Sequence, residues 1–349
     1  MAIFMLLLLI GFEMLLGLTL GNMAGDTRYV RLRENAANLN WDITPSPAEM
    51  SLSDNLEKKT YQFNTDENGF LLPSLEHENA DYTIAFIGGS TTENMYVDTQ
   101  TRFTHLVSKT LTTSQFKVNT INAGVSGNDS LNSINAYLNK IVPLKPEMAV
   151  LMHNVNDLSI LLHEGSYWND NYYRSPIIDE DKSLKSYVKN KIPNTYELLY
   201  RLVQSTKGPI DEFSRNGENK QVIDEEKIYN LFEENLNVFV AISKAKKIKP
   251  VLMTQASRFK EEPDALIKNT FQNLKGLGID YPQYKKLYDG LNERIRKVAT
   301  QNNITLIDLD KVVPQTNEYL YDPVHLNDKG SVLVAKTISQ SLKEVIKAN

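Results

Sequence analysis

Five short, mainly apolar segments, separated by longer stretches with helical spacing, constrain the fold of this chain more than any other feature. They lie at residues 83–87, 116–121, 148–152, 251–254 and 304–307. Apolar runs of this length are typical of strands that are buried on both faces of a parallel sheet. The alternation therefore predicts an α/β fold, a three-layer sandwich in which helices cover both faces of a five-stranded parallel sheet.

Helices are expected between and after these strands. The clearest covers residues 224–247, where an acidic first turn precedes an apolar stripe made by Ile228, Leu231, Phe232, Phe239 and Ile242. Others are expected at residues 101–111, 131–141, 284–301 and after Asn327 and Asp328. Ligands of such sheets bind beyond the carboxyl ends of the strands, so the turns after each strand are where chemistry is expected.

The N-terminus carries a long apolar run at residues 2–20. A helix of about 20 residues spans a hydrocarbon core of about 30 Å. A cleaved signal peptide is the alternative, but no basic residue precedes the run and no convincing cleavage site follows it. We therefore predict a transmembrane anchor at residues 1–21. Arg28, Arg31 and Arg33 follow it, and by the positive-inside rule they would place the rest of the chain in the cytoplasm.

Composition narrows the class of protein further. The formal net charge is −5 and the pI is near 5.7, which argues against nucleic acid as a partner. There is no cysteine, so disulfides, thiolate catalysis and cysteine-ligated metals are excluded. Residues 22–80 are polar and read as a linker and covering segment, followed by one domain at residues 81–349 with an insertion at about 164–223.

The first chemical motif is the turn that follows the first strand. Ser90 comes directly after Gly88 and Gly89, so a tight turn presents its hydroxyl with little steric cover. A nucleophile needs this exposure, although most turns of this composition are only turns. Position 92 is Thr, so the Gly-x-Ser-x-Gly elbow of α/β-hydrolases does not fit, and there is no lysine for a phosphate-binding loop.

The second motif lies before the last helix. Asp322 and His325 are three residues apart, a spacing that can place the carboxylate on one imidazole nitrogen. The other nitrogen is then free to accept a proton from a serine. The chain has five histidines, and this spacing distinguishes His325 from a lone surface or core histidine.

Two further turns supply candidate hydrogen-bond donors. Gly124 follows the second strand, and Asn156 follows the third. A glycine N–H and an asparagine amide at strand ends could face a developing oxyanion. Glycine and asparagine are also the ordinary residues of turns, and taken singly neither position indicates catalysis.

Together these turns resemble the four sequence blocks of the SGNH/GDSL hydrolase superfamily, which carry in this order the equivalents of Ser90, Gly124, Asn156 and His325. Asp322 stands three residues before the histidine, as in that family. The resemblance covers about residues 83–345 and implies a flavodoxin-like sheet. Two positions depart from the family pattern: Gly89 replaces the Asp of Gly-Asp-Ser, and Asn154 replaces the Gly of Gly-x-Asn-Asp.

The resemblance implies roles for these residues. Ser90 would be the nucleophile, His325 the base, and Asp322 the group that holds the histidine tautomer. The oxyanion would be held by the N–H groups of Ser90 and Gly124 and by the Asn156 amide. No metal or cofactor is needed for this chemistry.

The stretch 64–71, together with Gly-Gly-Ser-Thr-Thr at residues 88–92, resembles bacterial envelope members of the family. Those members often carry an N-terminal membrane helix and act on acylated polysaccharides. We therefore expect a membrane-anchored ester hydrolase with an extracytoplasmic catalytic domain, in spite of the arginines after the apolar run. The expected substrate is an O-acyl ester of a carbohydrate or a similar molecule, and acetyl is the acyl group that we favour. An O-acyltransferase with the same triad and a non-catalytic carbohydrate-binding scaffold are the alternatives.

Candidate substrate-binding residues lie in the insertion and near strand ends. Tyr167, Trp168, Tyr172 and Tyr173 could stack on sugar rings or form the core of a small subdomain. The remaining candidates follow the third and fourth strands, at Asn154, Gln255 and Arg258.

Overall fold

The computed structural model describes residues 2–20, 28–171, 173–179, 195–196, 199, 223–271 and 278–347. These fall into two units. The first comprises residues 1–31 and 177–200, and the second comprises residues 32–176 and 201–349. The second unit contains the sheet and all of the predicted chemistry.

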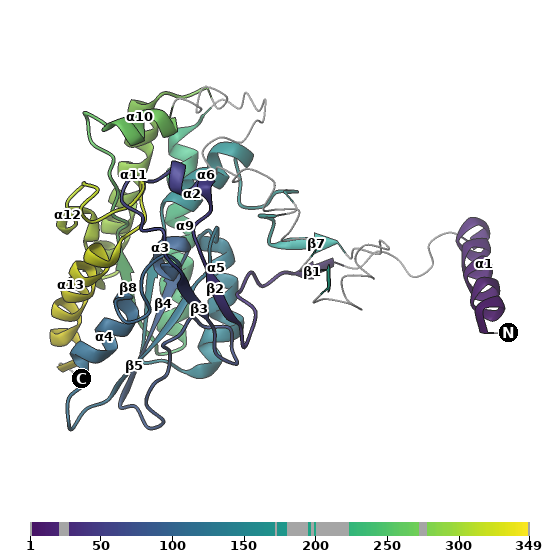
Figure 1. Ribbon diagram of the computed structural model, residues 1–349, viewed down its shortest axis with the longest axis horizontal. Helices are drawn as coiled ribbons and strands as arrows, with labels where there is room; N and C mark the ends of the chain where they lie inside the picture. The colour runs from purple at the N-terminus through teal and green to yellow at the C-terminus, as the bar shows by residue number, and fades with distance from the viewer. Residues whose placement is uncertain are drawn as a thin grey trace. The chain divides into compact units, whose positions relative to one another are not determined.

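The second unit is built on one parallel sheet of five strands (Figure 1). In the order in which they pair, the strands are β5 (Val118–Gly124), β4 (Tyr82–Gly88), β6 (Met148–Met152), β8 (Lys249–Met253) and β9 (Thr305–Ile307). The predicted five-stranded parallel sheet is confirmed. The chain passes from β4 to β5 on one side and then to β6 on the other, so the strand order reverses around β4. The carboxyl end of β4 is therefore at a switch point, where ligands of such sheets bind.

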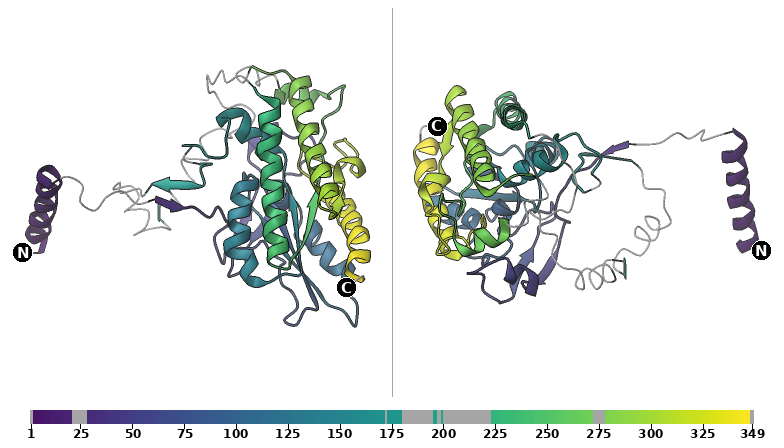
Figure 2. Two further views of the ribbon diagram at one scale, coloured as in Figure 1. Left: turned by 180° about the vertical axis from the view of Figure 1, so that it is seen from behind. Right: turned by 90° about the horizontal axis from the view of Figure 1, so that it is seen from above.

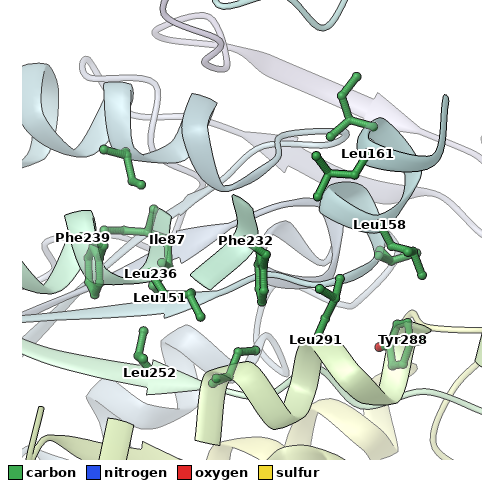
Figure 3. Close-up of a cluster of buried hydrophobic side chains, with 14 of the residues drawn as sticks. Ile87, Leu151, Leu158, Leu161, Phe232, Leu236, Phe239, Leu252, Tyr288 and Leu291 are labelled. Carbon is green, nitrogen blue, oxygen red and sulfur yellow. The ribbon is translucent and has the colours of Figure 1, made fainter. Parts of the chain in front are cut away.

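Alternate residues of each strand enter two separate hydrophobic cores, as the pleat of a strand requires. In β4, Ala85 and Ile87 face one core, while Ile84 and Phe86 face the other. Figure 3 shows part of the first core, in which helix side chains lie against strand side chains: Phe232, Leu236, Phe239, Ile87, Leu151 and Leu252. Each large apolar side chain buried in this way contributes about 1.5–3 kcal/mol.

Helices cover both faces, as the sequence predicts (Figure 2). The first core is closed by α5 (Ser130–Ala136, extended by a π turn at Tyr137–Ile141), α6 (Val155–Glu164), α9 (Glu225–Ala245) and α11 (Tyr281–Gln301). The second core is closed by α4 (Phe103–Leu111) and α13 (Asp328–Lys347). Helix α6 was expected only as a turn, because its first residues are of the type that turns favour. Buried Leu158, Leu161 and Leu162 make it a helix.

The covering segment has more structure than its polar sequence indicates. It forms a hairpin of β2 (Asn40–Ile43) and β3 (Tyr61–Asn64), and a short helix α2 (Pro47–Ser51). A capping box between Ser46 and Glu49 opens that helix. The segment also joins the sheet region, since the Leu71 N–H donates to the Asn122 carbonyl over 3.0 Å. The remaining short helices are α3 (Ser90–Glu93), α10 (Ala265–Phe271) and α12 (Leu309–Val312).

The first unit contains helix α1 (Ala2–Leu20) and an antiparallel pair of β1 (Arg28–Val30) with β7 (Ile177–Asp179). The apolar run is thus helical. Within the described residues, however, no helix combines the length and apolar character needed to cross a membrane. The prediction of a transmembrane anchor at residues 1–21 is therefore not supported. Of the predicted insertion, Tyr172 and nearly all of residues 180–222 lie outside the described residues.

Candidate active site

Ser90 stands at the carboxyl end of β4 and begins helix α3. Gly89 is the cap residue before it, and a side chain at that position would meet the Asn156 amide nitrogen, which lies 2.3 Å from where a Cβ atom would be. Backbone N–H groups in the first turn of a helix lack an intrahelical acceptor. The turn therefore presents both the Ser90 hydroxyl and the Ser90 N–H at the switch point of the sheet.

The loop before α13 brings a histidine and a carboxylate to this serine. His325 Nε2 lies 2.8 Å from Ser90 Oγ, and His325 Nδ1 lies 2.6 Å from Asp322 Oδ2. The other oxygen of Asp322 accepts the backbone N–H groups of Val324 and His325 over 2.9 and 2.7 Å. The carboxylate thus holds both the imidazole and the backbone that carries it.

Electrostatics keep Asp322 ionised. Burial favours the neutral carboxyl group, but the charge and hydrogen bond of His325 and the two backbone N–H groups outweigh it. Together they hold the pKa of Asp322 below the ordinary value for aspartate. An ionised carboxylate on Nδ1 leaves Nε2 as the nitrogen that can accept the serine proton.

Two residues fix the loop that carries His325. The Tyr321 ring stacks on the His325 ring, with centroids 5.6 Å apart and an interplanar angle of 9°. The Arg258 N–H donates to the Pro323 carbonyl over 2.8 Å, and the Arg258 guanidinium is held by Asp54 and Asp264. Arg258 therefore supports the loop from within the protein, since its side chain is only 2% exposed.

Asn156 lies in the first turn of α6, with its side chain directed to the Ser90 turn. Its amide nitrogen donates to the Asn128 carbonyl over 2.8 Å. A primary amide has two hydrogens, so one remains for a further acceptor beside Ser90. The structure thus brings the Asn156 amide beside the turn that carries Ser90.

Gly124 does not fit the role expected of it. The β5 strand extends to this residue, and its N–H donates to the Asn122 side-chain oxygen over 3.1 Å. The glycine is needed for close approach: a Cβ atom here would lie 2.2 Å from the Glu93 backbone nitrogen. Gly124 therefore lets the Ser90 helix pack against β5, and its N–H is already occupied.

Gly127, three residues further along, is the better donor from this turn. It adopts a φ of 73°, a conformation that favours glycine. Within the described part of the chain, no group accepts a hydrogen bond from its N–H. The next residue, Asn128, is the one that the Asn156 amide contacts. The sequence carries no signal that separates the two glycines, because only the structure shows that β5 extends to Gly124 and ends before Gly127.

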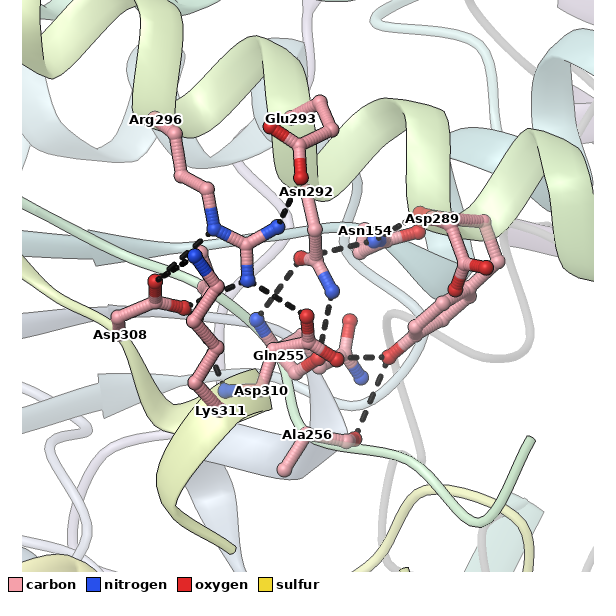
Figure 4. Close-up of polar contacts among 12 residues, drawn as sticks. Asn154, Gln255, Ala256, Asp289, Asn292, Glu293, Arg296, Asp308, Asp310 and Lys311 are labelled. Atoms are coloured by element: carbon pink, nitrogen blue, oxygen red, sulfur yellow. Dashed lines mark hydrogen bonds and ion pairs between the residues drawn. The ribbon is translucent and has the colours of Figure 1, made fainter. Parts of the chain in front are cut away.

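The turn that holds Asn156 is fixed from behind by a buried polar network, drawn in Figure 4. The Asn154 amide donates to the Tyr288 carbonyl and to the Asn292 side-chain oxygen over 2.9 and 3.0 Å. Gln255 Oε1 accepts the Val155 N–H over 3.0 Å. Asn154 and Gln255, both expected as substrate-binding residues, are buried here and hold the turn in place.

The aromatic candidates of the insertion separate into two kinds. Tyr167 is buried, and its hydroxyl donates to Asp157 Oδ1 over 2.6 Å. Burial and the neighbouring carboxylate raise the pKa of Tyr167 well above its ordinary value. Trp168 is 64% exposed and Tyr173 is 62% exposed, so both of these rings are open to solvent.

The chain matches the family model for GDSL-like lipases and acylhydrolases over residues 86–333. No curated protein matches it. Solved structures with a similar fold include a lipase/acylhydrolase from Enterococcus faecalis, at 16% identity over 76% of this chain and 96% of that chain, with a TM-score of 0.45. An acetylxylan esterase from Geobacillus stearothermophilus has 15% identity over 76% and 95%, with a TM-score of 0.43.

A third structure, an alpha/beta hydrolase enzyme from the metagenome of Lake Arreo, has 15% identity over 76% of this chain and 96% of that chain, with a TM-score of 0.43. Likenesses this distant say nothing of the substrate. The family match, by contrast, covers most of the chain, from β4 to the last helix. The chain belongs to the GDSL-like lipase/acylhydrolase family and is a serine ester hydrolase of the SGNH type.

Proposed function

We propose that this hydrolase cleaves an O-acyl ester through an acyl-serine intermediate. Ser90 Oγ attacks the ester carbonyl while His325 Nε2 takes its proton and passes it to the leaving alcohol as the carbon–oxygen bond breaks. Water, deprotonated by the same nitrogen, then attacks the acyl carbon, and the acid is released as the bond to Ser90 Oγ breaks and Oγ takes the proton back from His325. The supporting observation is the continuous contact from Asp322 Oδ2 through the His325 ring to Ser90 Oγ, at 2.6 and 2.8 Å.

The oxyanion of each tetrahedral intermediate is held by three donors in this proposal. They are the Ser90 N–H, the second hydrogen of the Asn156 amide, and the Gly127 N–H. Donors of this kind, fixed before the reaction, stabilise charge that develops only in the transition state. Gly127 takes the place that the sequence resemblance assigned to Gly124.

We further propose that the acyl group is short, with acetyl as the favoured group, and that the alcohol is a carbohydrate of the cell envelope. The resemblance of residues 64–71 and of the Ser90 turn to bacterial envelope members of the family supports this choice. Such a substrate requires the domain to act outside the cytoplasm, and that location is part of the proposal. The exposed ring of Trp168 is a candidate surface for sugar stacking.

Covalent labelling tests the chemistry, and product analysis tests the substrate. We expect a fluorophosphonate to modify the purified protein at Ser90 alone, as mapped by peptide mass spectrometry. The labelled protein should lose the ability to release acetate from O-acetylated oligosaccharides. Transfer of acetyl to an added sugar, without free acetate, would identify an acyltransferase, and labelling at another residue would contradict the mechanism.

Asn156→Ala should lower kcat by about 10²–10³-fold, because one oxyanion donor is removed. KM should change little, since the oxyanion exists only in the transition state and intermediate. Fluorophosphonate labelling of Ser90 should become slower in parallel. Steady-state kinetics on a simple acetyl ester measure both parameters.

The matched control is Asn119→Ala. Asn119 is also buried and its amide donates to a backbone carbonyl, that of His77, over 2.8 Å, but it lies near the opposite end of β5. Asn154 would be a poor control, because its amide holds α11. Equal losses of kcat in Asn156→Ala and Asn119→Ala would show that the loss reflects folding and would remove Asn156 from the oxyanion hole.

A further inference from the structure

The loop that carries Gly127 is pinned by side chains from distant parts of the chain. The Gly127 carbonyl accepts hydrogen bonds from Nη1 of Arg33 and Nη1 of Arg174, over 2.8 and 2.5 Å. The Asn128 amide in turn donates to the Arg33 carbonyl over 3.1 Å. The segment around Arg33 therefore holds two successive residues of the loop.

A second connection runs from the nucleophile turn itself. Glu93 is the last residue of the helix that Ser90 begins, and its carboxylate accepts the Ser126 hydroxyl, next to Gly127. The other carboxylate oxygen accepts the Asn35 amide over 3.1 Å. The same amide also contacts the Gly124 carbonyl over 3.3 Å. Asn35 thus contacts both the Ser90 helix and the end of β5.

This carboxylate depends on its partners. Glu93 is 1% exposed, and burial raises its pKa against the opposing effects of the Ser126 and Asn35 hydrogen bonds and the charge of Arg102. The guanidinium of Arg102 donates hydrogen bonds to three backbone carbonyls, those of Gln62, Leu72 and Asn94. A buried acceptor that loses a donor is left unsatisfied at a cost in free energy, so the chain must reorganise when one donor is removed.

We propose that Asn35 and Glu93 are positioning residues, which hold the Ser126–Asn128 loop, and with it the Gly127 N–H, against the Ser90 turn. The covering segment at residues 33–35 is then part of the active site, although it precedes the span of 86–333 that matches the family. The inference rests on the proposed function, in which Gly127 is an oxyanion donor.

Asn35→Ala tests the proposal, because Asn35 is only half-buried and its loss leaves the cores intact. We expect kcat on an acetyl ester to fall about 10–100-fold, less than for a donor that is removed, because the Gly127 N–H is displaced and not lost, with KM within about twofold. The rate of fluorophosphonate labelling at Ser90 should fall in proportion. Glu93→Ala should show the same fall in kcat, and Glu93→Gln should restore most of it, because the glutamine oxygen can still accept from Asn35 and its nitrogen can donate to Ser126 Oγ.

Asn55→Ala is the matched control. Asn55 belongs to the same covering segment and its amide donates to the Asn317 carbonyl over 2.6 Å, but it does not touch the Gly127 loop. An unchanged labelling rate in Asn35→Ala, or an equal loss in Asn55→Ala, would overturn the positioning role while leaving the triad intact. Failure of the wild-type protein to label at Ser90 would instead overturn the proposed function and this inference with it.

Discussion

Ser90→Ala should lower kcat for ester hydrolysis by roughly 10⁶-fold, or about 8 kcal/mol of transition-state stabilisation. The loss is this large because triad members act as a unit: without Oγ, neither His325 nor the oxyanion donors have a reacting atom to act on. The fold should persist, since the hydroxyl contributes only the 2.8 Å contact with His325 Nε2 among the described residues. Thermal unfolding should shift little.

Ser108→Ala is the control for this change. Ser108 is buried in α4 and its hydroxyl donates to the Val118 carbonyl over 2.7 Å, far from the carboxyl end of β4. It should lose a little stability and keep full activity. Turnover by Ser90→Ala at a rate close to that of wild type would end the proposed mechanism.

Asp322→Asn should lower kcat by about 10⁴-fold near neutral pH. The asparagine oxygen can still accept hydrogen bonds from the backbone N–H groups of Val324 and His325, so the loop stays in place. Its amide nitrogen then faces His325 Nδ1 and donates to it, which moves the imidazole proton to Nε2. A protonated Nε2 cannot accept the proton of Ser90. The kcat measured by steady-state kinetics and the rate of fluorophosphonate labelling at Ser90 should fall together.

Stability provides an independent measurement on the same variant. Because the folded-state pKa of Asp322 is lowered, its charge stabilises the fold above the ordinary aspartate pKa, and this contribution is lost as pH falls through the lowered value. The stability difference between wild type and Asp322→Asn should therefore narrow on acidification.

The control for the loss of kcat is Asp310→Asn, which weakens a 2.6 Å contact with Arg296 away from the site and should leave kcat unchanged. A similar kcat for the two variants would contradict the tautomer argument.

The sheet could be predicted because its signal is local. Strands such as Met148–Met152 are apolar on both faces, and the long helices carry apolar stripes that match those faces. The β2–β3 hairpin and α6 were missed for the opposite reason. Their polar residues favour turns in isolation. The hairpin becomes regular through contacts with distant residues such as Tyr321, and α6 through burial of its leucines in the first core.

The site was predictable where chemistry dictates spacing. A separation of three residues can bring the Asp322 carboxylate to one nitrogen of His325, and Ser90 directly follows a strand. Burial is not visible in local sequence, so Gln255 and Arg258, which hold strand-end loops from inside, were mistaken for cleft residues. Asn35 carries no local signal at all, because its contact with Glu93 joins residues 58 positions apart.

The close approach of Asn156 to Gly89 has a consequence for how such enzymes are recognised. Members of the family carry an aspartate at the position of Gly89. Here the side-chain amide of Asn156, from α6, occupies the space that a side chain at position 89 would need. Restoring that aspartate alone would push aside the group proposed to hold the oxyanion. In this chain an aspartate at position 89 is therefore incompatible with the present place of the Asn156 amide, and a search that fixes Gly-Asp-Ser would pass over this chain although it has the Ser90–His325–Asp322 contacts.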